Sequence, residues 1–598
     1  MAKKQKDLLP IDYTSREFSS IQSDLLDIAE RFYPDTFQDF SEGSFGSMMI
    51  DAVSYVGDQL SFYMDYNVNE SFLDTAFQFS NIVRHGRALG YKFEGRPSTY
   101  GTVAMYLIVP ASPSGIGPDE TYLPILKRGT TFSSTNNLSF ILTENIDFAS
   151  TKNVFVVARN DSVTGAPTFY AVKAYGNVVS GQFGQERITV GAFEKFKRVT
   201  LNADNVSEII SVYDSEGNQY YEVDFLAQDV IFKEISNPNF KNDNVPSIIK
   251  PYLVSRKFIT QTNRNQITLQ FGSGRLNENN VVENPQNVAV NTYGKTYVTN
   301  MTFDPSRLSE NESFGIVPTN TELIITYRSN NPINSNVAAG QINSVTFSNF
   351  EFIDQQTLNS PTLQTIRSSL EVSNEEPISG DVSIPTSDEI KQRIYDTFPT
   401  QNRAVTQADY ENLAYRMPVK FGSVKRVSVQ RDADSQKRNL NFYVISEGTD
   451  GKLLKSNSVI KNNLKTWLNQ YRMINDTVDI LDPFILNYGI EFIVRPQQAS
   501  DKFSVLDSCL EALKENYDQT HFIGESLYIS DIYKVLKDVP GVLDVLNVKI
   551  FMKSGGSYSN ASIDVDSNTS GDGSQLIVPN NAILELKFPQ LDIVGKLR

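Results

Sequence analysis

The chain is poor in the side chains on which metal sites and nucleophilic catalysis depend. Its 598 residues include two histidines and one cysteine, Cys509. Two histidines cannot supply a three-histidine zinc site, and a mixed site would have a single thiol to use. One cysteine also excludes an internal disulfide and is typical of a protein from a reducing compartment.

Long apolar runs and a leader-like start are missing as well. No stretch of about 18 apolar residues occurs, so we expect no membrane-spanning helix. The first residues lack the apolar core of a secretory signal, and Lys3, Lys4 and Lys6 are more typical of a solvated tail. These features predict a protein that is made and assembled in a cytoplasm.

Basic side chains are outnumbered by acidic ones. Lysine and arginine total 54 against 70 aspartates and glutamates, which gives a formal net charge of −16. Such a chain repels phosphate backbones, so nucleic acid is not an expected partner. Hydrophobic residues make up 40% of the chain and charged residues 21%, which is a globular composition. Because one core does not extend over 598 residues, we expect several domains.

Complete catalytic motifs are also absent. Gly448–Lys452 is too short for a phosphate-binding loop, and the lone Gly-x-Gly within Phe271–Gly274 is explained by a tight turn. His85, His521 and Cys509 lie on or beside predicted helices, where structural roles are expected. A glycosidase-type carboxylate pair leaves no spacing signature, because its members meet only in the fold. These observations predict a protein that is not an enzyme and needs no cofactor.

One polar segment near the C-terminus begins like a calcium loop. Asp564–Asn568 has the alternating carboxylates, but the glycine of the sixth position and the glutamate of the twelfth are missing. A polar turn is therefore the expected structure, with no metal. If a metal were bound, Asp564, Asp566 and Asp572 would be the first carboxylates to inspect.

Residues 11 to about 95 carry helix signals. Thr14 and Glu17 have the spacing of a capping box, Pro34 ends the first helix, and Gly43 with Gly46 predicts a turn. Between the capping box and Pro34, apolar residues recur at helical spacing: Phe18, Ile21, Leu25, Ile28 and Phe32. A third helix is expected to carry further apolar residues and end near Gly90: Phe72, Leu73, Ala76, Phe79 and Val83.

The second helix carries the candidate interface, a stripe of apolar residues. Its members alternate steps of four and three, the a/d spacing of a coiled coil: Met49, Val53, Val56, Leu60 and Tyr63. The opposite positions hold aspartates seven residues apart: Asp51, Asp58 and Asp65. Two interpretations stay open. The stripe packs within an ordinary bundle of this chain, or it joins a helical bundle shared between chains, since the region has few other apolar surfaces to bury.

From about residue 100 the apolar pattern changes to period two, as in strands. Val103, Met105, Leu107 and Val109 alternate with their neighbours. Further strand candidates are separated by Gly, Asn and Pro: Phe140–Leu142, Val154–Val157, Phe169–Ala174, Tyr220–Phe225, Ile267–Phe271 and Leu323–Tyr327. So many strands without helices predict sandwich or barrel packing.

Helices and strands alternate in the C-terminal part. Ser387 and Thr406 are candidate N-caps, the latter with a capping-box partner in Asp409. The following helices are expected at Ser456–Gln470, Phe503–Tyr517 and Ile529–Val539, and the strands at Val424–Val429, Leu440–Ile445, Val478–Val494 with a break at Pro483, and Val542–Phe551. This interleaving predicts an α+β module of ferredoxin-like type.

The expected fold class is therefore an α+β multidomain protein. It consists of a helical N-terminal region (1–98, an inter-chain bundle), a β-rich middle (99–375), an α+β module (376–553), and a polar loop with a terminal strand (554–598).

Two blocks far apart in the chain, Asp39–Met48 and Gln401–Tyr410, carry a family resemblance. Further matching segments are Asp12–Phe18, Asn69–Ala76, Phe271–Gly274, Gly315–Pro318, Asn336–Gly340, Asn374–Gly380, Met417–Arg426 and Val578–Ile583. On these segments the chain resembles the baseplate J-like family, and within it the long wedge protein of contractile-tailed phages of the T-even type.

The resemblance implies a structural role in a virion. In that family two copies dimerise within each baseplate wedge, and helices near their N-termini form a bundle with a helix of another wedge protein. The wedges join through C-terminal domains into a ring around the central hub, and the ring rearranges when the tail contracts. The implied partners are copies of this chain, other wedge proteins and hub or sheath-proximal proteins.

Two alternatives use the same sequence features differently. A tail adhesin or carbohydrate-binding protein is suggested by the β-rich middle and the chain's 28 tyrosines, although tyrosines in strands are usually packing residues. A tail depolymerase is the third hypothesis, and the missing site signals disfavour it.

Overall fold

The computed structural model of the protein describes most of the chain. The described residues are 17–32, 44–95, 97–114, 116–237, 247–263, 266–275, 314–330, 335–353, 355–380, 385–432, 439–448, 450–497, 501–517 and 520–598. The expected cap at Thr14, the N-terminal lysines, the helix break at Pro34 and the turn residue Gly43 lie outside them. The chain forms two compact units, Met1–Lys92 with Pro385–Tyr395, and Phe93–Ile384 with Asp396–Arg598.

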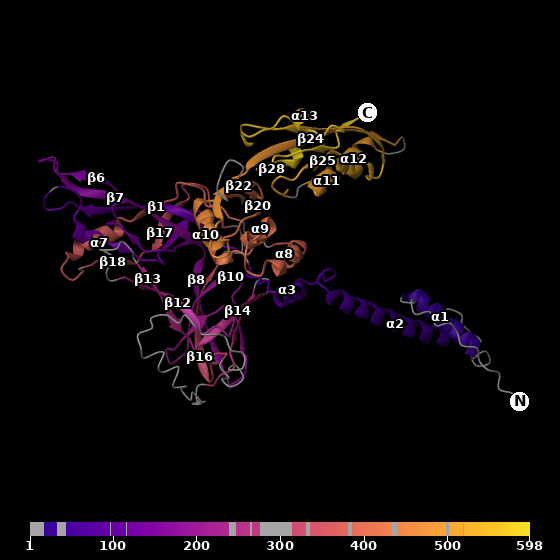
Figure 1. Ribbon diagram of the computed structural model, residues 1–598, viewed down its shortest axis with the longest axis horizontal. Helices are drawn as coiled ribbons and strands as arrows, with labels where there is room; N and C mark the ends of the chain where they lie inside the picture. Colours follow the sequence, from indigo (N-terminus) through magenta and orange to yellow (C-terminus); the bar gives the residue numbers. More distant parts are fainter. Residues whose placement is uncertain are drawn as a thin grey trace. The chain divides into compact units, whose positions relative to one another are not determined.

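The first unit is helical (Figure 1). Its helices are α1 (Phe18–Phe32), α2 (Phe45–Glu70), α3 (Phe79–Ala88) and the first part of α8 (Ser387–Thr400). Ile82 and Val83 of α3, like Ile390 and Ile394 of α8, are buried. A side chain at Gly86 would collide with Ile394, so glycine at this position lets the two helices approach closely.

Two expectations for this unit need correction. The domain division assigned α8 to the C-terminal module, whereas residues 385–395 cluster with the N-terminal helices. Lys391 donates a 2.9 Å hydrogen bond to the carbonyl of Asp74, and Tyr395 donates one to its carboxylate, so long-range contacts decide the assignment. The turn expected at Gly46 is instead the first turn of α2, because Ser44 caps that helix by accepting a hydrogen bond from the Ser47 amide.

The second unit begins with a seven-stranded sheet whose long central strands are β1 (Tyr100–Pro110) and β7 (Pro167–Ser180), paired antiparallel. The other strands are β3 (Thr131–Ser134), β4 (Ser139–Leu142), β6 (Val154–Asn160), β17 (Ile342–Phe347) and β19 (Glu371–Ser373). A small sheet of β2 (Ile125–Leu126), β5 (Ile146–Asp147) and β18 (Phe350–Glu351), together with α7 (Ser360–Ser368), supplies apolar side chains to the same core.

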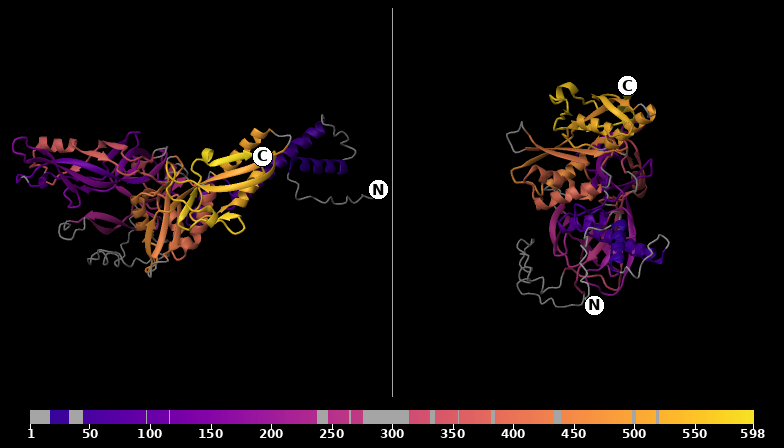
Figure 2. Two further views of the ribbon diagram at one scale, coloured as in Figure 1. Left: turned by 90° about the horizontal axis from the view of Figure 1, so that it is seen from above. Right: turned by 90° about the vertical axis from the view of Figure 1, so that its right-hand side faces the viewer.

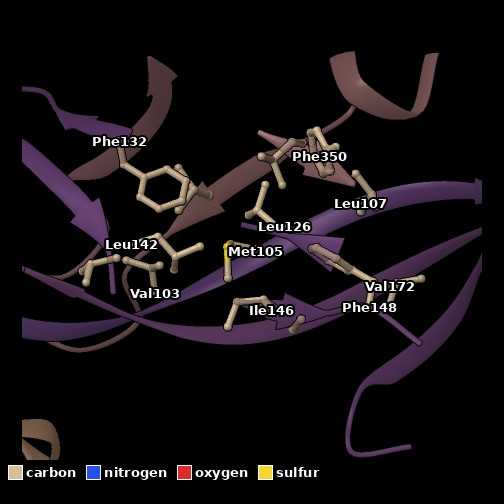
Figure 3. Packing of buried hydrophobic residues seen from close by; sticks show 14 of the residues in the cluster. Val103, Met105, Leu107, Leu126, Phe132, Leu142, Ile146, Phe148, Val172 and Phe350 are labelled. Carbon is tan, nitrogen blue, oxygen red and sulfur yellow. The ribbon is translucent and has the colours of Figure 1, made fainter. Parts of the chain in front are cut away.

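The period-two pattern of β1 correctly predicts one buried face of the strand, although Ala104 on the other face is buried as well. Val103, Met105, Leu107 and Val109 are fully buried on one face of the sheet. Figure 3 shows Met105 surrounded by side chains from other strands, among them Ile146. The core of the β-rich body therefore lies on this face.

A second seven-stranded sheet has its own core. In order across the sheet, its strands are β8 (Gln182–Val190), β16 (Thr321–Ser329), β10 (Val206–Tyr213), β11 (Gln219–Glu222), β14 (Lys257–Asn263), β15 (Gln266–Phe271) and β9 (Arg198–Thr200). Two further strands, β12 (Val230–Ser236) and β13 (Ser247–Leu253), form a separate ribbon. The buried Arg328 connects the two large sheets by donating 2.8 Å hydrogen bonds to the Ser98 hydroxyl and the Ser180 carbonyl.

The C-terminal part contains two mixed sheets. The first joins β20 (Arg426–Arg431), β21 (Asn439–Glu447), β22 (Leu453–Lys455) and β23 (Thr477–Leu481), with α9 (Gln407–Tyr415) and α10 (Ser458–Leu468). The second places β24 (Phe484–Pro496) between β26 (Val542–Met552) on one side and β28 (Ala582–Glu585) with β29 (Ile593–Leu597) on the other. The remaining elements are α11 (Lys502–Tyr517), β25 (Leu527–Tyr528), α12 (Ile529–Lys537), α13 (Val565–Asn568), β27 (Gln575–Leu576) and α14 (Pro589–Asp592).

This topology differs from the expected ferredoxin-like module. A ferredoxin-like fold has one antiparallel sheet, whereas β21 pairs in parallel with β23, and β24 pairs in parallel with β28 and β29. Two strands of the terminal segment 554–598, β28 and β29, therefore belong to the sheet of β24. The break at Pro483 is confirmed, because β23 ends at Leu481 and β24 begins at Phe484.

The two predicted N-caps have different outcomes. Thr406 and Asp409 form the expected capping box, with 3.2 Å from the Asp409 amide to the Thr406 hydroxyl and 2.8 Å from the Thr406 amide to the carboxylate. Ser387 lies inside α8. Thr386 takes the capping role instead, because its hydroxyl accepts from the Glu389 amide.

Candidate assembly interface

The predicted stripe on α2 forms an exposed apolar surface. Met49, Val53, Val56, Leu60 and Tyr63, here called the seam stripe, each have between 47% and 59% of their surface exposed. They share one side of a single 26-residue helix. The described part of the chain therefore leaves about half of the surface of each stripe residue exposed.

The opposite side of α2 faces α1 and is small and polar. Ser54 and Ser61 are buried there, and a side chain at Gly57 would come 3.2 Å from Cδ1 of Ile21. Gln22 of α1 donates a hydrogen bond to Asp51 of α2. The usual pattern of a helix in a soluble protein is reversed, since its polar side is covered and its apolar side is exposed.

A second apolar stripe lies beside the first, and sequence reasoning missed it. Its first five members each precede a seam position by one residue, and Tyr66 continues the same steps of four and three: Met48, Ala52, Tyr55, Gln59, Phe62 and Tyr66. Its four large members are between 38% and 63% exposed. A helix with two adjacent stripes of this spacing has room for two partner helices, whereas one stripe serves only one.

The C-terminal end of α2 is held firmly against α3. The Glu70 carboxylate accepts hydrogen bonds from the Asn81 amide side chain and from the backbone amides of Phe77 and Gln78, at 2.8–3.0 Å. The side-chain bond from Asn81, with the two backbone bonds, lowers the pKa of Glu70. His85 Nε2 lies 2.8 Å from the carbonyl oxygen of Glu70, so this histidine has a structural role. The turn between α2 and α3 is therefore fixed by polar contacts.

The third helix is shorter than predicted. It begins at Phe79, so Phe72 and Leu73 lie in the preceding turn. Phe72 and Phe77, which follow α2 in the chain, are strongly exposed as well. No described helix combines the length and apolar composition needed to span a membrane.

The other two residues considered for catalysis, His521 and Cys509, have contacts that indicate structural roles. His521 lies 3.0 Å from the hydroxyl of Tyr488, whose burial raises its pKa above the usual range. Its other ring nitrogen is 3.6 Å from the Glu525 carboxylate. Cys509 is buried in α11, and burial raises the pKa of its thiol to about 11. Such a thiol is protonated at neutral pH and is a poor nucleophile.

The polar C-terminal carboxylates are not gathered into a metal site. Asp572 accepts hydrogen bonds from Ser570 and Ser574 of its own turn. These bonds lower the pKa of Asp572 to about 2, and the bond from the Ser570 hydroxyl contributes most. Asp564 and Asp566 lie at the start of α13. Within the described ranges, no three His, Cys, Asp or Glu side chains come together as metal ligands.

Glycine in the Phe271–Gly274 motif has a steric explanation. A side chain at Gly272 would collide with the backbone carbonyls of Phe314 and Gly315. The amide of Gly274 donates a 2.9 Å hydrogen bond to the Gly315 carbonyl. The motif therefore lets two backbone segments approach closely and needs no ligand to explain it.

Comparison with known proteins identifies the segment that carries α1, α2 and α3. Residues 18–88 match the family model described as the N-terminal domain of bacteriophage baseplate protein. This match supports a structural role in a phage tail baseplate. The two apolar stripes therefore lie in a segment similar to a baseplate N-terminal domain.

Solved structures and curated sequences add the following comparisons. A chain of the 6-fold symmetrised cryo-EM structure of the anti-feeding prophage baseplate is 9% identical, with 96% of this chain and 90% of that chain covered and a TM-score of 0.24. A chain of the type VI secretion system TssK-TssF-TssG baseplate subcomplex is 8% identical, with 73% and 95% covered and a TM-score of 0.24. No curated protein matches the chain.

Proposed function

We propose that the protein is a structural subunit of a contractile-tail baseplate wedge of the J-like type. Two copies associate in each wedge, and their α2 helices form a bundle with a helix from another wedge protein. The proposed place of the protein is the virion, assembled in the host cytoplasm, with no catalytic role, cofactor or nucleic-acid partner.

The observation that carries this proposal is the pair of exposed stripes on α2, within the segment that matches the baseplate domain. Fully burying an apolar side chain contributes about 1.5–3 kcal/mol, so a half-exposed one has about half of that to gain. One stripe then offers roughly 4–8 kcal/mol and both offer roughly 7–14 kcal/mol. Association costs an estimated 4–15 kcal/mol, so a stable bundle needs both stripes to be covered.

Contacts between wedges are proposed for the α+β region within 376–553. Interfaces within a wedge, built on apolar stripes, should be permanent. Contacts that join wedges into a ring around the hub should be smaller and more polar, because the ring has to rearrange when the tail contracts.

The proposal is tested by a charge placed in the seam stripe. Val56→Asp in the full chain should abolish association in sedimentation experiments, since an unpaired carboxylate in an apolar bundle costs several kcal/mol. The thermal midpoint of the separated chain should barely change, because Val56 is already half exposed. Ile474→Asp is the matched control, because it makes the same kind of change at an almost fully exposed turn residue. Normal assembly of Val56→Asp would mean that the stripe is not an interface.

A tail adhesin or carbohydrate-binding protein remains the alternative. Tyr106 and Tyr175 on the first sheet resemble a sugar platform, but Lys173 lies over both rings, 5.7 and 4.8 Å from their centres. Imaging of the tail separates the two proposals, since a wedge protein surrounds the tail axis and an adhesin lies at the periphery. A depolymerase at the periphery would cleave polysaccharide.

A further inference from the structure

The β12–β13 ribbon leaves the second sheet as a separate arm. In Figure 1 and in the left view of Figure 2, the two strands run apart from the neighbouring sheets. Seven residue pairs join the strands in antiparallel register, and neither strand packs substantially on another described element. An isolated two-stranded ribbon is marginally stable in water, so contact with a partner would stabilise it.

Strand periodicity and the register divide the ribbon into two faces. One, here called the acidic face, carries Val230, Phe232, Glu234, Ile249, Pro251 and Leu253. The other, here called the basic face, carries Ile231, Lys233, Ile235, Ile248, Lys250 and Tyr252. Each face thus combines apolar side chains with charge of one sign.

Apolar side chains on both faces are exposed. On the acidic face, Phe232 and Ile249 have 72% and 68% of their surface exposed. On the basic face, Ile248 and Tyr252 have 42% and 50% exposed. On the basic face, Tyr221 of β11 accepts a hydrogen bond from Lys233 and its ring lies beside Tyr252, while Ile248 and Lys250 stay exposed.

The charges on the two faces are complementary. Lys233 and Lys250 are register partners, and like charges directly opposite each other destabilise a strand pair. The ammonium group of Lys233 lies 4.1 and 4.2 Å from the ring centres of Tyr221 and Tyr252, while Lys250 is exposed. A carboxylate placed against this pair would relieve the repulsion. Glu234, exposed between Phe232 and Ile249, carries the only charge among the described residues of the acidic face.

We propose that the acidic face of this ribbon packs on the basic face of the ribbon of a second copy. Glu234 then lies against the lysine pair of its neighbour, and the apolar side chains around these charges cover one another. Such a contact uses different surfaces on the two copies and is therefore heterologous, not two-fold symmetric.

The geometry of two stacked sheets allows this contact. Stacked sheets lie about 10 Å apart, and Glu234 is displaced from the lysine pair by one residue, about 3.4 Å along the strand. A seven-residue, two-stranded face measures roughly 24 by 10 Å, so the contact buries about 500 Å² in total. Stable interfaces bury about 1,000 Å² or more. The ribbon contact should therefore form only between copies that are already held together, and in this respect it rests on the proposed function.

Site-directed cross-linking of the full chain tests the contact. Ile249→Cys marks the acidic face and Ile248→Cys marks the basic face, so two neighbouring positions serve as matched controls for each other. Two differently tagged copies are mixed, assembled and treated with a short bismaleimide, while the native Cys509 is buried. The mixed pair should cross-link several-fold more than either variant with itself. Equal or stronger cross-linking within one variant would overturn a heterologous contact.

Charge exchange tests the role of Glu234. Adding Glu234→Lys to the Ile249→Cys copy should cut the mixed cross-link several-fold, and adding Lys250→Glu to the other copy should restore much of it. Asp204→Lys, the same change at another exposed carboxylate of this unit, should have no effect. Loss of the cross-link while sedimentation still shows assembly would refute this inference alone. A protein that stays monomeric would refute the proposed function first.

Discussion

Gln22 on α1 donates a hydrogen bond to Asp51 on α2, with 2.5 Å between Nε2 and Oδ1. This bond lies on the polar side of α2, beside the contact between Ile21 and Gly57. It keeps α1 on the side of α2 that lacks large apolar residues. The apolar stripes stay uncovered because of this arrangement, and α1 does not compete with the proposed partner helices.

The α1–α2 contact should depend on the size of residue 57. Gly57→Ala should stabilise the first unit by up to about 1 kcal/mol, because alanine favours the helix and its methyl group, 3.2 Å from Cδ1 of Ile21, requires only a small shift of that flexible side chain. Gly57→Leu should separate α1 from α2, since a larger side chain does not fit against Ile21. Hydrogen exchange would show faster exchange in α1 for leucine and slower exchange for alanine. Protection of α1 in both variants would contradict the packing described for this pair.

The turn between α2 and α3 should weaken in acid. Hydrogen bonds lower the pKa of Glu70 below its ordinary value of 4.5. Stability from the ionised carboxylate is therefore fully present above that value and is lost as the pH falls through the lower folded pKa. Glu70→Gln should lower the thermal midpoint at neutral pH and flatten its decrease between about pH 5 and pH 3. Glu30→Gln on the exposed side of α1 is the control and should leave both unchanged.

Local sequence patterns predicted the individual helices and strands better than they predicted which of these elements pack together. The alternation at Val103 and Met105 indicates a half-buried strand, and the capping box at Thr406 indicates a helix start, because both signals reside in neighbouring residues. Which strand pairs with β24 depends on residues 98 positions away, and no local signal encodes that choice. The ferredoxin-like prediction is not confirmed for this reason. The contact of α8 with α3 was missed on the same grounds.

Of the two stripes in the candidate interface, one was predicted from the sequence. The seam stripe follows from its heptad spacing, and its exposure agrees with an inter-chain surface without testing one. The second stripe was also readable, since Met48, Tyr55 and Phe62 are seven residues apart. It was missed because only one heptad register was followed. Its importance depends on knowing that α1 covers the polar side of α2.

The C-terminal sheet should need the last residues of the chain. Leu584 and Ile593 of β28 and β29 are buried in the core formed with β24, α11 and α12. A fragment covering residues 396–598 should therefore melt cooperatively, whereas residues 396–553 should melt broadly or aggregate. Differential scanning calorimetry distinguishes the two. A sharp transition for the shorter fragment would show that β28 and β29 contribute little to this core.

The free edge of the first sheet should limit solubility. Strand β6 pairs only with β7 in the described structure, and all seven of its residues are exposed. It begins with the run Val154–Val157, and an exposed apolar edge strand is a template for pairing with other chains. Val156→Lys should reduce aggregation on heating and leave the thermal midpoint nearly unchanged, because a charge on an edge discourages pairing. Light scattering during a thermal ramp measures this. Val172→Lys is the contrasting variant, since Val172 of β7, the register partner of Phe155, is fully buried and its replacement should prevent folding. If Val156→Lys aggregates as readily as the native chain, another surface controls its association.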